Sequence, residues 1–157
     1  MRTLDEILID SAKRHKHLCP RQVLGACMGL FAVELLGIEL PRNDKRLLVI
    51  SETDGCVVDG LIAATNCRVG SRTLRIMDFG KVAATFADIY TEETIRIIPR
   101  KEARSLAVKH VPDARNNWEA MQLGYRLMSA SDLFIVQHVE LDKPLAQIVS
   151  RPDESGL

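Results

Sequence analysis

The chain has 157 residues, of which 46% are hydrophobic and 27% are charged. This length suits one domain, and such a domain buries roughly two-thirds of the surface of its unfolded chain. The 21 Lys and Arg residues balance the 21 Asp and Glu residues. The composition therefore excludes an intrinsically disordered chain and provides no basic surplus for the phosphates of nucleic acid. Aromatic residues make up 4%, too few for a base-stacking surface.

Cysteine content and hydropathy indicate the compartment. Four cysteines are too few for a disulfide scaffold in a chain of this size. Residues 1–16 mix charged with apolar side chains, unlike a signal peptide, and no apolar run reaches the ~20 residues that span a bilayer. We therefore expect a cytoplasmic protein without a membrane span, whose thiols are free or bound to metal.

The N-terminal half predicts three helices and one strand. Apolar residues recur at helical spacing over residues 3–13. Pro20 suits the first turn of a second helix over residues 20–36. This helix is apolar on nearly all sides, so we expect it at the centre of the fold. A short buried strand over residues 47–50 and a helix over residues 55–64 follow.

The C-terminal half predicts a cluster of strands, two helices and a returning strand. The strands are expected at residues 74–77, 82–90, 94–98 and 133–141, and the helices at residues 101–110 and from Asp113 onward. Residues 82–98 are predicted to form a hairpin. This order indicates an α+β fold, with helices packed on a mainly antiparallel sheet. We assign residues 1–141 to a single core domain and residues 142–157 to a polar C-terminal tail.

Two imidazoles and a thiol lie within five residues, at His15, His17 and Cys19. Cys19 comes directly before the second helix, where free backbone N–H groups and the helix dipole favour a thiolate. His17 and Cys19 point to the same side of an extended chain, so both side chains can reach one metal ion. The alternative is that the histidines are exposed polar residues that lead into a helix.

A second thiol, Cys56, is expected in the first turn of the helix over residues 55–64. Asp59 shares its face of that helix. The pair suits a metal site, a proton relay, or simply a small buried cysteine beside a capping carboxylate. Cys67 follows at the far end of the helix, roughly 15 Å from Cys56. These two thiols can share an ion only if the chain folds back or a second copy contributes one.

Two further features favour ordinary structural roles. Residues 78–81 lie between two predicted strands and fit a hairpin turn with Gly80 at its tight position. Lys81 in this turn is either a solvated lysine or a functional one. Gly25 and Gly29 are four residues apart on the second helix, so they favour close packing against a neighbouring helix.

The order and spacing of these residues form a specific pattern. It consists of His15-x-His17-x-Cys19-Pro20, Gly25, Glu52-Thr53-x-x-Cys56-x-x-Asp59, Cys67-x-x-Gly70 and Asp78-x-Gly80-Lys81-x-Ala83-x-Thr85-Phe86. Over about residues 5 to 140, this pattern resembles the FmdE family, which is named after formylmethanofuran dehydrogenase. The resemblance implies an α+β core domain that forms an intertwined homodimer. It also implies a metal, zinc or another divalent ion, near the first two motifs.

The resemblance also implies the site residues. The expected metal ligands are His17, Cys19 and Cys56, with His15, Asp59 and Cys67 as lesser candidates. Cys19 and Cys56 are also the catalytic candidates, together with Lys81 as a contact for substrate or an anion. A His/Cys/Cys set with an open fourth position suits zinc. Lys16 stands where the family usually has glycine, so His15 is the least expected ligand.

Three kinds of function stay open. The family name implies an accessory or metal-handling protein linked to a molybdenum or tungsten formylmethanofuran dehydrogenase complex of one-carbon metabolism. The alternatives are a free-standing enzyme that uses the thiolate/metal site for redox or hydrolytic chemistry, and a binding module with a structural metal. Many family members also carry a C-terminal zinc ribbon, and no cysteine follows Leu141, so we expect the core domain alone. Among these functions we favour a metal-binding homodimer.

Overall fold

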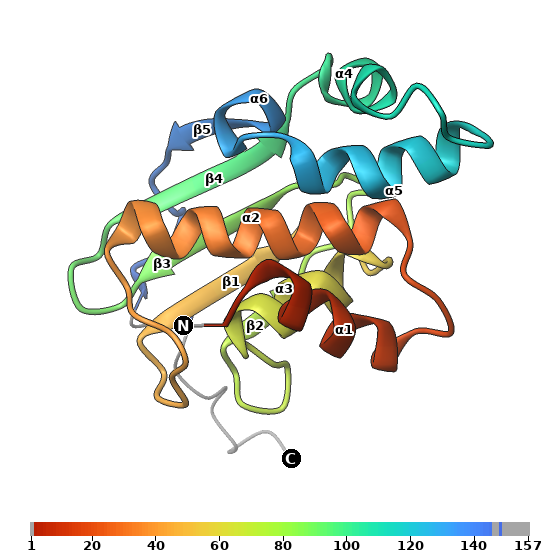
Figure 1. The fold of residues 1–157 in the computed structure, drawn as a ribbon. Coiled ribbons are helices and arrows are strands. Elements are labelled where there is room, and N and C mark those ends of the chain that lie inside the picture. Colours follow the sequence, from red (N-terminus) through yellow and green to blue (C-terminus); the bar gives the residue numbers. More distant parts are fainter. Residues whose placement is uncertain (1, 146–147, 149–157) are drawn as a thin grey trace.

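The computed structural model describes residues 2–145 and 148. Its elements in chain order are α1 (Leu4–Arg14), α2 (Pro20–Leu36), β1 (Leu47–Ser51), α3 (Val57–Thr65), β2 (Leu74–Ile76), β3 (Ala84–Asp88), β4 (Thr94–Pro99), α4 (Ala103–His110), α5 (Asn117–Leu127), α6 (Ala130–Leu133) and β5 (Phe134–His138). Figure 1 shows α2 lying across the sheet, with α1 and α3 to one side of it and α4, α5 and α6 to the other. In the described part of the chain, no helix is long and apolar enough to cross a membrane.

The strands form one sheet in the order β2-β1-β3-β4-β5. Only β1 and β2 run parallel, and the β1–β3, β3–β4 and β4–β5 pairs are antiparallel. The register aligns Val49 with Phe86 and Phe86 with Ile95, which places apolar side chains from three central strands on one face. The α+β class and the mainly antiparallel sheet predicted from the sequence are confirmed.

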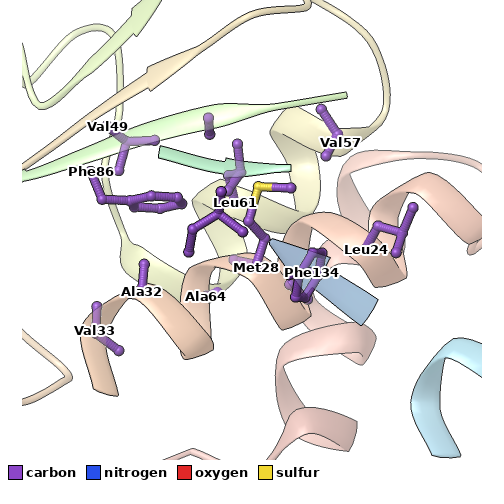
Figure 2. Packing of buried hydrophobic residues seen from close by; sticks show 14 of the residues in the cluster. Leu24, Met28, Ala32, Val33, Val49, Val57, Leu61, Ala64, Phe86 and Phe134 are labelled. Carbon is purple, nitrogen blue, oxygen red and sulfur yellow. The ribbon is translucent and has the colours of Figure 1, made fainter. Parts of the chain in front are cut away.

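Alternation along the strands separates two apolar clusters. Val49, Phe86 and Ile95 belong to the main core together with side chains of α1, α2 and α3. Figure 2 shows Val49 and Phe86 facing Met28 and Ala32 of α2 and Leu61 of α3. The alternate residues Leu48, Ile50 and Ala87 form a second, smaller cluster with Leu145 on the opposite face. Helices therefore cover one face of the sheet.

Two glycines allow α2 and α3 to touch through their backbones. A Cβ atom at Gly25 would collide with the Val57 carbonyl oxygen, and one at Gly60 with the Gln22 carbonyl oxygen. Further along both helices, Gly29 packs against Ala64. Because the contacts advance in the same direction along both chains, α2 and α3 run parallel. Their N-termini therefore lie side by side, which decides the position of the site described below.

Several predicted boundaries and one predicted turn need correction. Residues 78–81 do not close a hairpin, because β2 and β3 lie on opposite sides of β1 and these residues cross from one edge to the other. The helix expected from Asp113 begins at Asn117, where the Asn116 side chain accepts a hydrogen bond from the Glu119 N–H. The last strand begins after α6. Of the tail assigned to 142–157, the structure describes residues 142–145 and 148, and the rest lies outside the described residues.

Candidate functional site

The two candidate thiols meet because α2 and α3 begin at the same end of the molecule. Cys19 is the N-cap residue of α2, and Cys56 directly precedes α3. Both line a single pocket of about 570 Å³. Cys19 is buried and Cys56 is partly exposed, so a molecule in the pocket would reach Cys56 more readily.

A buried glutamine fixes Cys19. The backbone N–H of Cys19 donates to Gln22 Oε1 over 2.7 Å. The Gln22 Nε2 group donates to both the carbonyl oxygen and the hydroxyl of Ser11 on α1, each at 3.1 Å. Burial raises the pKa of the Cys19 thiol; the Gln22 N–H opposes the rise, and the neighbouring Cys56 thiol adds to it. Gln22 thus ties the end of α1 to the start of α2.

His15 lies between a thiol and a carboxylate. It follows the last residue of α1 in an extended conformation. Its Nε2 atom lies 3.5 Å from Cys56 Sγ, and its Nδ1 atom lies 3.5 Å from Asp59 Oδ2. An imidazole in this position can move a proton from the thiol, or hold its free nitrogen toward a metal while the carboxylate orients the ring.

The loop between β1 and α3 places Cys56. The Ser51 hydroxyl donates to the Thr53 carbonyl oxygen over 2.7 Å, and the Thr53 hydroxyl accepts from the Gly55 N–H. Glu52, although part of the same motif, has a structural role. Its carboxylate pairs with Arg96 on β4 through contacts of 2.6 and 3.0 Å.

The remaining sequence candidates lie around or away from this cluster. The ring of His17 lies 5.2 Å from the His15 ring and 6.1 Å from Trp118, centroid to centroid. Cys67 is buried beyond the C-terminal end of α3, with its sulfur 3.5 Å from the Leu47 carbonyl oxygen. Lys81 is exposed, and its neighbour Val82 lines the pocket. The structure brings together His15, Cys19, Cys56 and Asp59, with His17 adjacent, but not Cys67.

Sequence reasoning missed Gln22 and most of the pocket wall. The pocket is also lined by Arg21 of α2, by Arg100, Lys101 and Arg104 around the start of α4, and by Trp118, Met121 and Tyr125 of α5. Three cations within five residues after a predicted strand, from Arg100 to Arg104, were the available signal. The contact of α5 with Cys19 and Cys56 depends on tertiary packing and had no local signal.

The donor atoms do not form a ready metal cage. Among residues 2–145 and 148, no three His, Cys, Asp or Glu side chains converge closely enough to hold an ion as they stand. The donor chemistry nevertheless fits zinc, because two thiols and an imidazole share one place and the second imidazole nitrogen faces a carboxylate.

Comparisons with known proteins agree with the motifs. The sequence profile described as "FmdE, Molybdenum formylmethanofuran dehydrogenase operon" matches residues 14–153. A protein of Archaeoglobus fulgidus described as a probable S-adenosyl-L-methionine-binding protein is 35% identical over 85 residues, which are 52% of this chain and 23% of that relative. The chain therefore matches less than a quarter of the length of this relative.

A solved structure shares the fold. The crystal structure of an FmdE-like protein of tungsten formylmethanofuran dehydrogenase, from Syntrophus aciditrophicus, superposes with a TM-score of 0.70. The match covers 98% of this chain and 79% of the other, at 19% sequence identity. At this identity the likeness concerns the fold, whereas the sequence profile covers most of the chain. The chain belongs to the FmdE family.

Proposed function

We propose that this chain forms a zinc-type metal centre from His15, Cys19 and Cys56, and that it serves an accessory or metal-handling role for molybdenum or tungsten enzymes of one-carbon metabolism. The carrying observation is the 3.5 Å separation between His15 Nε2 and Cys56 Sγ. Tetrahedral zinc holds an imidazole nitrogen and a thiolate sulfur roughly 3.6 Å apart. The operon association in the family description supports the accessory role.

Each residue has a distinct part in this proposal. Cys56 and His15 are ligands, and Cys19 supplies the third donor after a small side-chain adjustment. Asp59 accepts a hydrogen bond from His15 Nδ1 and so keeps Nε2 free for the ion. When bound, the ion would supply a Lewis acid at the wall of the pocket. His17, which the family resemblance ranked above His15, borders the set through its contact with the His15 ring.

A second candidate function rests on the same three side chains without a metal. Cys56, His15 and Asp59 stand in the order nucleophile, base and orienting carboxylate. In this arrangement His15 Nε2 takes the proton of the Cys56 thiol, and Asp59 stabilises the resulting imidazolium. The chain would then be a free-standing enzyme that attacks an electrophilic carbon through a thiolate.

Metal analysis tests the first proposal. Protein purified without chelator is expected to contain stoichiometric metal, and Cys19→Ser, Cys56→Ser and His15→Gln are each expected to lose most of it. Cys67→Ser is the matched control, because Cys67 lies beyond the other end of α3. Full metal content in both Cys19→Ser and Cys56→Ser would refute the centre.

Alkylation of the metal-free protein tests the second candidate. If His15 activates Cys56, iodoacetamide should label Cys56 about tenfold more slowly in His15→Gln and in Asp59→Asn. His17→Gln should leave the rate unchanged. Equal rates in all four proteins would exclude the relay and leave the metal proposal untouched.

We also infer that the chain works as a homodimer. Ile76, Met77 and Phe79 follow the end of the edge strand β2 and expose 40%, 53% and 63% of their surface. Exposed apolar side chains that are contiguous in the chain are typical of a protein–protein contact. The family resemblance supports a second copy as the occupant.

A further inference from the structure

The pocket that contains the two thiols has a cationic lining. Arg21 contributes from the first turn of α2, Arg100 and Lys101 from the segment after β4, and Arg104 from α4. The described residues that line the pocket include no aspartate or glutamate. The chain as a whole has a net charge of zero, so this concentration of positive charge is local.

These four cations are not neutralised within the described structure. Among residues 2–145 and 148, none of them forms an ion pair with a carboxylate, whereas Arg46, Arg96 and Arg126 all do. Unneutralised cations around a concave surface raise the local concentration of anions and attract anionic ligands from a distance. The lining therefore favours a ligand that carries negative charge.

Two of the guanidinium groups are already held in place. Arg100 Nε donates to the Ser131 carbonyl oxygen over 2.8 Å. Arg104 contacts the hydroxyl of buried Tyr125; burial raises the pKa of Tyr125, and the nearby charge of Arg104 opposes that rise. Groups that are fixed before a ligand arrives lose less conformational entropy when they bind it.

The opposite wall of the pocket is apolar. Trp118 and Met121 of α5 line it together with Leu24 of α2 and the residues Val82 and Pro99. Trp118 exposes 45% of its surface, so a large aromatic face is available to a ligand. Such a wall favours an apolar or aromatic body, because stacking on an indole and removal of apolar surface from water are both stabilising.

We propose that this pocket binds a small oxyanion-bearing molecule with an apolar or aromatic body, and that Arg21, Arg100, Lys101 and Arg104 hold its anionic group. The ligand would lie with its body on Trp118 and in reach of Cys56. This inference deepens the proposed function and rests on it only for what the thiols do to the ligand. Binding itself depends on the cationic lining and the aromatic wall.

A matched pair of dyes tests the charge requirement. The probe is 8-anilinonaphthalene-1-sulfonate, and its control is N-phenyl-1-naphthylamine, which has a similar aromatic body and no anionic group. Trp118 is the only tryptophan of the chain, so quenching of its fluorescence reports dye bound at this wall. We expect the sulfonate to bind at least about tenfold more tightly than the neutral dye, and to weaken as salt is added.

Substitutions locate the site. Lys101→Gln/Arg104→Gln should weaken the sulfonate about tenfold or more and leave the neutral dye unchanged. Lys109→Gln on the same helix is the matched control, because Lys109 is exposed and lies outside the described lining. If the double variant unfolds, the salt dependence measured on the unaltered protein still decides. Equal affinity for the two dyes, or sulfonate binding that ignores both salt and the double substitution, would overturn the proposal.

Further measurements identify the anion and separate this proposal from the metal centre. Phenyl phosphate and benzoate are used as competitors, and displacement by either one supports the site and identifies the preferred group. The titration is repeated on Cys19→Ser/Cys56→Ser. Sulfonate binding that persists in a variant without metal supports the anion site even where the metal centre fails, and binding lost there together with the metal overturns it as a separate site.

Discussion

The Asp88 carboxylate is fully buried at the end of β3 and depends on a single cation. Arg46 donates to it through Nε at 2.9 Å and through a second nitrogen at 2.7 Å, and the Tyr90 N–H donates as well. Arg46 holds the pKa of Asp88 down at about 2, below its ordinary value of 3.8. Because the folded pKa is depressed, the pair stabilises the fold above pH 4 and loses this contribution as the pH falls toward 2.

Asp88→Asn is therefore expected to lower the free energy of unfolding at pH 7 by about 2 kcal/mol. The difference from the unaltered protein should shrink toward pH 2, where Asp88 becomes protonated. Urea unfolding between pH 2 and pH 7 measures both effects. Asp44→Asn is the control, because the pKa of Asp44 is also about 2 beside Arg42, but its side chain is exposed. Solvent screening should make the Asp44 effect much smaller, and equal effects would contradict this account.

At the scale of elements, the parallel contact of α2 with α3 determines whether the thiols meet. A methyl group at Gly60 would overlap the Gln22 carbonyl oxygen and crowd the Ala26 nitrogen. Backbone atoms cannot rotate away as a side chain does, so the two helices must separate. Gly60→Ala is expected to lower the free energy of unfolding by about 3 kcal/mol or more.

The matched control is Gly70→Ala. A Cβ atom there would meet no atom within 4 Å, and Gly70 is not in a left-handed conformation. Its stability should stay within about 0.5 kcal/mol of the unaltered protein. Thermal and urea unfolding of both variants measure the difference, and a well-folded Gly60→Ala protein would show that the helices are less closely fitted than described.

Across the whole molecule, local patterns predicted the elements but not their contacts. Pro20, an apolar run and Gly37 defined α2 correctly, since capping and periodicity are properties of neighbouring residues. The cysteine pair was foreseen because each thiol precedes a helix. The choice of His15 over His17 as the partner of Cys56 depends on how α1 ends against α3, and the Trp118 wall depends on where α5 lies. Neither has a local signature.

The homodimer is a property of the whole molecule, and its interface is expected to include the apolar residues after β2. Burying an exposed phenylalanine contributes roughly 2 kcal/mol, so Phe79→Glu should weaken dimerisation at least about tenfold. Leu127→Glu is the control, since Leu127 is equally exposed, at 64% against 63%, but lies on α5. Sedimentation equilibrium gives both dissociation constants. If the unaltered protein sediments as a monomer, or if both variants dimerise alike, Phe79 does not lie at a dimer contact and its exposed face must serve another partner.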